Sequence, residues 1–396
     1  MRGRHITSSF VSTLGVALLL SCGGNKDGAS AGGTGGSGAG QGGSGTSAGG
    51  SNGGGGTGSG GGLGSGGQTG SGGRVGTDGQ AGAGGTAGHG SGGSVGVDGG
   101  VGPSGDGGPA SSNCTGVPWP TGGDPTKAGP FQVISDKNVG PLAGAVPDPV
   151  YGNAQQRFNV YRPADLSQGG YCHPIILWGN GHTDNPEPNP PACLSANFCG
   201  DYRVIINQLA SQGFVVIASL STIVSQPDPA TGLLPQLVGL NWILQQSEDP
   251  TSPYYRHLDT AHVGATGHSE GGFATSVVGS DPRIIAIATM AGATATPKLH
   301  QPALFLCGGQ DTVVPCSTIQ KSFDAITSTP VMLEENPTAS HGSWIGSIRD
   351  PYQVAVTAWM RVHLMGDTAL RTMFYGTNCQ LCQNAQVMVQ RRNMEQ

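Results

Sequence analysis

The residues best suited to chemistry are five consecutive ones, Gly267-His268-Ser269-Glu270-Gly271. They follow the apolar, small-residue run Val263–Thr266 and precede a helix-compatible segment, so we expect a strand, a sharp turn and a helix in that order. Gly267 and Gly271 suit such a turn because a Cβ at either position would clash with the neighbouring strand or helix. This context is typical of a nucleophile elbow, which presents the hydroxyl of Ser269 at the edge of a sheet.

A serine hydroxyl is a weak nucleophile unless a histidine takes its proton and a carboxylate orients that histidine. Asp311 follows the expected strand Ala303–Cys307, and His341 follows the expected strand Val331–Glu334. Both residues therefore lie just beyond the carboxyl end of a strand. Serine, aspartate and histidine in this chain order are typical of an elbow of this kind. We predict that Ser269, Asp311 and His341 form a catalytic triad.

Other carboxylates and histidines are weaker candidates for the acid and the base. We expect the rival acids to lie in turns, in loops, at the surface or behind the residues that contact the substrate. Of the rival bases, one lies within an expected helix and the other precedes a strand at the opposite edge of the sheet. These rivals are Asp259, Asp281, Glu334 and Glu335 for the acid, and His300 and His363 for the base.

An oxyanion hole needs two backbone donors near the nucleophile. One is the N–H of the residue after the serine, Glu270, and the other comes from the loop after an earlier strand. That loop is Gly179–Thr183, and we predict that the N–H of His182 is the second donor. The simpler interpretation is a plain Gly-Asn-Gly turn, and this does not exclude a donor at His182.

The first 22 residues resemble an export signal. Arg2 and Arg4 precede the modestly apolar run Ile6–Leu20, which is too short to span a membrane. Leu-Leu-Ser-Cys, ending at Cys22, resembles a bacterial lipobox, whose cysteine carries a lipid anchor. Gly23 follows where an acidic residue would favour retention in the inner membrane. We therefore expect a lipid anchor in the outer membrane, the alternative being an ordinary signal peptide and secretion.

Residues 23–112 are rich in Gly and Ser and contain almost no large apolar side chain, so we expect a disordered linker. Residues 113–396 have the size of one α/β domain. The net charge of −6 is mild, and no basic stripe suggests nucleic-acid binding. The sequence leaves the oligomeric state open, and we expect a monomer.

Eight of the nine cysteines follow Cys22, and an even number in an exported chain favours disulfides. Short spacings predict the pairs Cys193–Cys199, Cys307–Cys316 and Cys379–Cys382, which leaves Cys114 with Cys172. The Cys379-x-x-Cys382 pair could instead be redox-active or half of a metal site. A structural bridge is favoured because neither a thioredoxin-like context nor a second Cys-x-x-Cys is present. We expect no metal and no cofactor.

Strand-like and helix-like segments alternate through the domain, which predicts a mainly parallel sheet with helices on both faces. The expected strands are Phe158–Tyr161, Pro174–Trp178, Gly213–Ala218, Val263–Thr266, Arg283–Met290, Ala303–Cys307 and Val331–Glu334. The expected helices are Asp201–Gln212, Leu233–Ser247, the segment after the elbow, Ser317–Ile326 and Pro351–Leu364. The short connection between Met290 and Ala303 leaves no room for a lid, so we expect an open site.

The domain resembles the α/β-hydrolases, and within them the bacterial cutinase-like polyester hydrolases and their dienelactone-hydrolase-like relatives. The matching residues are Gly181-His182-Thr183, Leu209–Val216, Gln226-Pro227-Asp228, Gly267–Gly272, Asp311-Thr312 with Pro315, and His341. The resemblance implies a three-layer α/β-hydrolase fold without a lid domain, and a serine esterase that needs no cofactor. Its substrate would be a carboxylic ester, which an open site allows to be polymeric.

Three departures from these relatives bear on the substrate. His182 stands where they have an aromatic residue, Glu270 stands where they have methionine, and their substrate-clamping tryptophan falls near Gly292. Much aromatic stacking would be lost, and we expect the Glu270 carboxylate to favour polar or cationic substrate groups. The alternatives to an esterase are a peptidase of the same fold and a non-catalytic, surface-tethered binding module.

Overall fold

The structure is a computed structural model. It describes residues 113–144, 156–182, 193–195, 198–199, 202–221, 223–228, 231–294, 299–348 and 351–395, with backbone alone for 193–195 and 198–199. The predicted signal peptide (1–22) and linker (23–112) lie outside the described residues. Among these residues, no helix combines the length and apolar character needed to cross a membrane.

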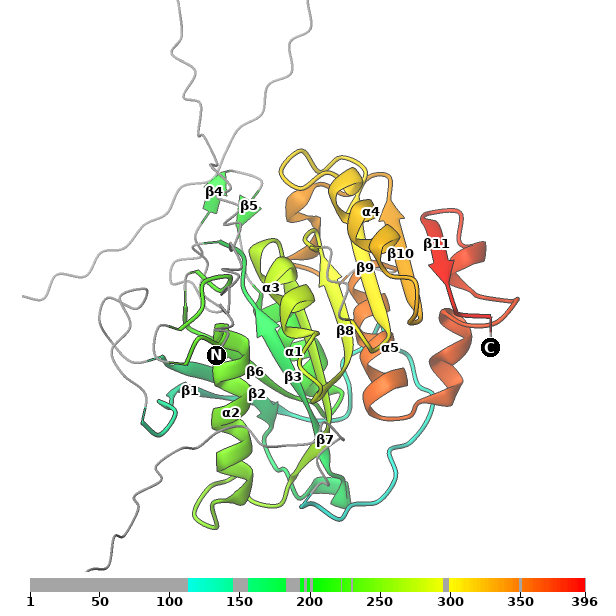
Figure 1. The fold of residues 1–396 in the computed structure, drawn as a ribbon. Coiled ribbons are helices and arrows are strands. Elements are labelled where there is room, and N and C mark those ends of the chain that lie inside the picture. Colours follow the sequence, from blue (N-terminus) through cyan, green and yellow to red (C-terminus); the bar gives the residue numbers. More distant parts are fainter. Residues whose placement is uncertain are drawn as a thin grey trace, which may run out of the picture. The chain divides into compact units, whose positions relative to one another are not determined.

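Nine strands form one mixed sheet in the part of the chain that the structure describes (Figure 1). In order across the sheet they are β1 (Val133–Val139), β2 (Phe158–Pro163), β6 (Val215–Ser219), β3 (His173–Gly179), β7 (Leu258–His268), β8 (Ile284–Met290), β9 (Ala303–Gly308), β10 (Val331–Asn336) and β11 (Met388–Arg392). The six strands from β6 to β10 are parallel, whereas β2 is antiparallel to β1 and β6, and β11 is antiparallel to β10. A separate small ribbon pairs β4 (Cys193–Ser195) with β5 (Phe198–Cys199).

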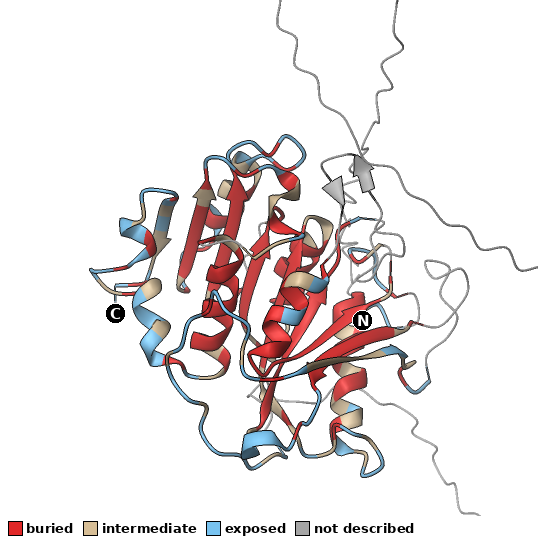
Figure 2. Cartoon of the chain, turned by 180° about the vertical axis from the view of Figure 1, so that it is seen from behind, coloured by how far each residue is buried: buried red, intermediate tan, exposed pale blue. Residues whose placement is uncertain are grey.

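Helices cover both faces of the sheet. Side chains of α2 (Pro235–Glu248), α3 (Glu270–Val278) and α4 (Cys316–Ala325) share one core with one face. Side chains of α1 (Arg203–Ser211) and α5 (Tyr352–Leu364) form a second core with the other face. Figure 2 shows the inner strands of the sheet mostly buried, whereas the edge strands β1 and β11 are not. Short 3-10 helices are η2 (Gln168–Gly170), η3 (His341–Trp344), η4 (Thr368–Met373) and η5 (Leu381–Gln383).

This three-layer arrangement confirms the predicted fold class and is consistent with an α/β-hydrolase fold. Continuous apolar runs such as the one in β3 are buried along their whole length, as expected for parallel strands covered on both faces. The connection between β8 and β9 extends only over residues 291–302. Strands β1 and β11 were not predicted, and both are edge strands with exposed polar residues.

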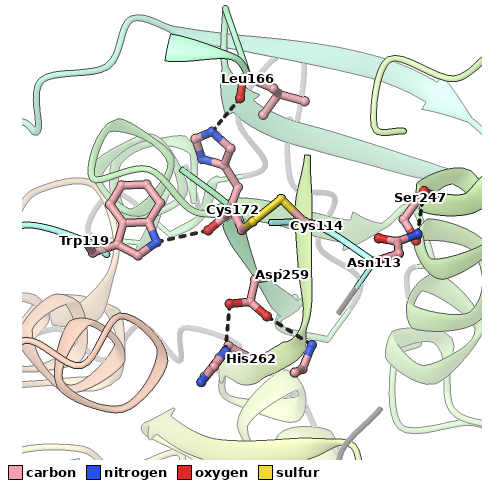
Figure 3. Close-up of a disulfide and its surroundings, with 10 residues drawn as sticks. Asn113, Cys114, Trp119, Leu166, Cys172, Ser247, Asp259 and His262 are labelled. Atoms are coloured by element: carbon pink, nitrogen blue, oxygen red, sulfur yellow. Dashed lines mark hydrogen bonds and ion pairs between the residues drawn. A yellow bond between two sulfur atoms is a disulfide. The ribbon is translucent and has the colours of Figure 1, made fainter. Parts of the chain in front are cut away.

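A disulfide attaches the beginning of the domain to the sheet (Figure 3). Cys114 is bonded to Cys172, and the indole N–H of Trp119 donates to the Cys172 carbonyl at 3.0 Å. Cys172 immediately precedes β3, so this attachment lies at the amino-end edge of the parallel strands. Trp119 also stacks on Tyr171 with ring centroids 4.3 Å apart.

The predicted pairs Cys114–Cys172, Cys307–Cys316 and Cys379–Cys382 are confirmed as disulfides. In the backbone of the small ribbon, Cys193 lies opposite Cys199. The side chains of that pair lie outside the described residues, so its disulfide stays a prediction.

Candidate active site

Strand β7 ends at His268, and α3 begins at Glu270, so Ser269 alone makes the turn between them. Its backbone angles, φ 56° and ψ −120°, lie in a region that residues with a side chain rarely occupy. Such a conformation costs about 1–3 kcal/mol and persists only where the surroundings impose it. Here the Ser269 N–H donates to the carbonyl of Met290 at 2.9 Å, and its carbonyl accepts from Gly272 N at 2.9 Å.

The glycines of the elbow allow three backbones to approach closely. A Cβ at Gly271 would lie 2.0 Å from the carbonyl oxygen of Gly179, and a Cβ at Gly267 would lie 2.5 Å from that of Gly271. No side chain tolerates these distances, so the end of β3, the end of β7 and the start of α3 can pack together only with glycine at both positions. The result is a turn that is fixed against the neighbouring strand.

The structure brings Ser269, Asp311 and His341 together at the carboxyl-end edge of the sheet. The Ser269 hydroxyl lies 2.9 Å from His341 Nε2, and His341 Nδ1 lies 2.7 Å from Asp311 Oδ2. An ionised carboxylate only accepts hydrogen bonds, so Nδ1 carries the imidazole proton and Nε2 is left to accept from the serine. Asp311 and His341 are buried, whereas Ser269 is partly exposed.

Backbone contacts hold the aspartate and its loop. Asp311 Oδ1 accepts from the N–H groups of Val313 and Val314, both at 2.8 Å. Because its other oxygen binds His341, the carboxylate is fully engaged and its orientation is fixed. The Cys307–Cys316 disulfide closes the loop around Asp311, as predicted.

Glu335 and the two sulfurs of that disulfide lie close enough together to hold a metal ion by distance alone. The sulfurs are bonded to each other, so neither is a thiolate, and a single carboxylate remains. These residues do not fit a metal site.

A buried chain of hydrogen bonds links the loop after β3 to the backbone of His341. The Gly181 N–H donates to the Tyr202 hydroxyl at 3.0 Å, and this hydroxyl lies 3.0 Å from His268 Nδ1. His268 Nε2 lies 2.9 Å from the carbonyl oxygen of His341. The carbonyl can only accept, so Nε2 donates to it and the Tyr202 O–H donates to Nδ1. The roles of the Tyr202 and His268 side chains could not be predicted from the sequence, because only contacts made on folding connect them to His341.

Burial lowers the pKa of His268 to about 3 from an ordinary value of 6.5, and the nearby His341 adds to this effect. At a pH between about 3 and 6.5, His268 therefore binds a proton in the unfolded chain but not in the folded protein. The free energy of unfolding should therefore fall as pH falls below 6.5, by about 2 kcal/mol at pH 5 for this residue. Urea denaturation at pH 7 and pH 5 measures the loss.

His268→Gln should make this pH dependence shallower. Burial also lowers the pKa of His363, within α5, to about 3, so His363→Gln provides a second variant away from the site. An equal change of stability with pH in the wild type and both variants would contradict this explanation.

The two predicted oxyanion donors lie on neighbouring loops. Glu270 is the first residue of α3, and the first N–H groups of a helix have no partner within it. Its carboxylate lies 2.5 Å from His182 Nδ1 and also accepts two hydrogen bonds from Ser225. Protein donors thus contact both oxygens of the carboxylate, and its expected preference for polar or cationic substrate groups stays a prediction.

Gly292 has no space for a side chain. A Cβ there would lie 2.1 Å from the carbonyl oxygen of Ser269. Gly292→Ala should therefore displace Ser269, the candidate nucleophile, lower the melting temperature and reduce kcat by about 10²-fold. Initial rates and thermal denaturation measure both effects.

The matched control for this substitution is Val277→Ala on the exposed face of α3, where the side chain is 45% exposed. This control should leave both quantities nearly unchanged. Unchanged kcat and melting temperature in Gly292→Ala would contradict the steric argument.

The rival candidates for the acid and the base contact other residues or lie elsewhere in the fold. Asp281 pairs with Arg283 at 2.7 Å, Asp259 binds His262 at 2.8 Å near the start of β7, and His363 lies 3.2 Å from the Tyr375 hydroxyl. Glu334 and Glu335 lie within β10, and His300 precedes β9. None of the hydrogen bonds described for Ser269 or His341 involves these six residues.

Comparison with known families supports an ester-cleaving function for this fold. Residues 201–393 match the family model described as PET hydrolase-like. This segment includes Ser269, Glu270, Asp311 and His341, while His182 precedes it. Over these residues the chain is similar to polyester hydrolases. No curated protein matches the chain.

Proposed function

We propose that the protein is a serine hydrolase that cleaves carboxylic esters through an acyl-enzyme. The observation that carries this proposal is the pair of hydrogen bonds from Ser269 to His341 and from His341 to Asp311, at 2.9 and 2.7 Å. The similarity to PET hydrolase-like proteins supports an ester as the bond that is cleaved.

In the first half of the reaction, His341 Nε2 removes the proton of the Ser269 hydroxyl as its oxygen attacks the ester carbonyl carbon. The imidazolium that forms is stabilised by the Asp311 carboxylate. His341 then gives this proton to the departing alcohol oxygen as the ester C–O bond breaks. The product is an acylated Ser269 and a free alcohol.

In the second half, a water molecule enters and His341 removes one of its protons. The resulting oxygen attacks the acyl carbon, and the proton passes to the Ser269 oxygen as the acid leaves. In both halves the backbone N–H groups of Glu270 and His182 would donate to the carbonyl oxygen as it becomes negative.

We expect aliphatic esters to be better substrates than aromatic polyesters. The site offers His182 and Gly292 where the related polyester hydrolases offer aromatic rings, and stacking contacts contribute about 0.5–1.5 kcal/mol each. The short connection between β8 and β9 supports the expectation of an open site, in which a polymer chain could reach Ser269.

Turnover of matched esters and amides tests the reaction class. Wild-type protein should hydrolyse p-nitrophenyl butyrate and leave a peptide p-nitroanilide essentially intact. Faster cleavage of the amide would favour the peptidase, and no turnover of either substrate would favour a binding module.

We also propose that Cys22 carries a lipid anchor and that residues 23–112 form a tether. The Cys114–Cys172 disulfide holds the first residues of the domain at the amino end of β3, whereas Ser269 lies at the carboxyl-end edge of the sheet. An anchored enzyme would thus present its site away from the attachment point. Cys22→Ala should shift the protein from the membrane fraction to the soluble fraction, and unchanged fractionation would contradict the anchor.

A further inference from the structure

Glu270, the residue after the proposed nucleophile, connects the start of α3 to two separate loops. Glu270 opens α3, His182 follows β3, and Ser225 follows β6. The Glu270 carboxylate lies 2.5 Å from His182 Nδ1 through Oε2. Through Oε1 it accepts from the Ser225 N–H at 3.0 Å and from the Ser225 hydroxyl at 2.6 Å. All three segments lie at the carboxyl-end edge of the sheet, where Ser269 is located.

These contacts explain how a carboxylate is tolerated beside an oxyanion. A free negative charge next to the developing oxyanion would oppose catalysis. Here three protein donors share that charge, the positive end of the α3 dipole lies beneath it, and its side chain is only 11% exposed. Charge-assisted hydrogen bonds of this kind are stronger than those between neutral groups. The carboxylate therefore serves as an anchor for its neighbours.

The loop that needs an anchor is the one after β3. Gly181 is fixed from the interior, since its N–H donates to the buried Tyr202 hydroxyl at 3.0 Å. His182 is different, because its side chain is 50% exposed. The contact with Glu270 is the one hydrogen bond found for the His182 side chain among the described residues.

We propose that Glu270 is a positioning residue, which holds His182 so that the His182 backbone N–H faces the oxyanion. This inference rests on the proposed function, since it concerns the oxyanion hole of that reaction. Glu270 acts through the loop and touches neither the acyl group nor the alcohol. Its effect belongs to the transition state, where the carbonyl oxygen carries negative charge.

The test compares Glu270→Met, which keeps the side-chain length without the charge, with Glu270→Gln, which keeps an acceptor for Ser225. Loss of a whole oxyanion donor costs about 10²–10³-fold in kcat, and loss of its support should cost about 10–10²-fold. Glu270→Met should show this fall in kcat with KM nearly unchanged, and Glu270→Gln should recover part of it. Glu248→Gln removes an equal charge at the exposed end of α2 and should change neither constant.

A tetrahedral probe separates positioning from general stability. Butylboronic acid bonds reversibly to the serine oxygen, and one boronate oxygen then occupies the oxyanion hole. Its affinity for Glu270→Met should fall in parallel with kcat. Unchanged boronate affinity and kcat would overturn the proposal, and so would a raised KM with kcat preserved, which would mean that Glu270 contacts the substrate.

The partner side chains provide variants that depend less on folding of the elbow. His182→Ala removes the imidazole and keeps the backbone N–H, so it should lower kcat by a factor similar to that of Glu270→Met. In the double variant the two losses should not add, because each breaks the same contact. Additive losses would overturn the proposal. Failure of wild-type protein to hydrolyse any ester would instead refute the proposed function.

Discussion

Replacing Ser269 with alanine should reduce kcat for p-nitrophenyl butyrate by about 10⁴- to 10⁶-fold, because the acyl-enzyme then has no oxygen to form on. The oxyanion donors and the substrate contacts would remain, so a small rate above that of water is expected to persist. Steady-state kinetics with active-site titration measure the loss. KM should change little, because the hydroxyl contributes mainly to the transition state.

The matched control for this substitution is Ser280→Ala, an exposed serine just beyond the end of α3. Both variants should keep the wild-type circular dichroism spectrum. Activity of Ser269→Ala close to that of Ser280→Ala would show that another residue is the nucleophile.

Asp311→Asn should lower kcat by about 10⁴-fold while leaving the fold intact. The carboxylate holds the imidazole proton on Nδ1, 2.7 Å away. An amide nitrogen at the same position donates, which forces the proton onto Nε2, where it faces the Ser269 hydroxyl. The histidine could then no longer accept the serine proton. Initial rates with p-nitrophenyl butyrate measure the loss.

Asp324→Asn in α4 makes the same chemical change at an exposed position and should retain wild-type kcat. A loss of less than tenfold in Asp311→Asn would mean that His341 keeps its orientation without the carboxylate. The aspartate would then have no catalytic role in the proposed reaction.

The parallel strands could be predicted because each is a short apolar run. Strand β3, for example, is buried on both faces along all seven residues, and such a run has no other stable place in a soluble domain. Edge strands lack this signal. Strand β1 contains Ser135, Asp136 and Lys137, and β11 ends in two arginines, so hydrogen bonding to a neighbour is what defines them.

The candidate triad could be located from the sequence because each residue follows a predictable element: the elbow strand, β9 and β10. The contacts that support the triad could not be located in this way. Tyr202 is 66 residues from His268, and Ser225 is 45 residues from Glu270, so only packing of α1 and the loop after β6 brings them together. The hydrogen bonds of the Glu270 carboxylate to His182 and Ser225 could not be predicted for the same reason. Chain order predicts which loops meet, and side-chain contacts appear only after folding.

The most direct test of the central claim is covalent labelling of the wild-type protein with a fluorophosphonate, followed by digestion and mass spectrometry. The probe phosphonylates a serine only where a neighbouring base removes its proton. We predict one equivalent of label on the peptide that contains Ser269, and loss of labelling in Asp311→Asn. Stable wild-type protein that takes up no label, or takes it up at a different serine, would contradict the account.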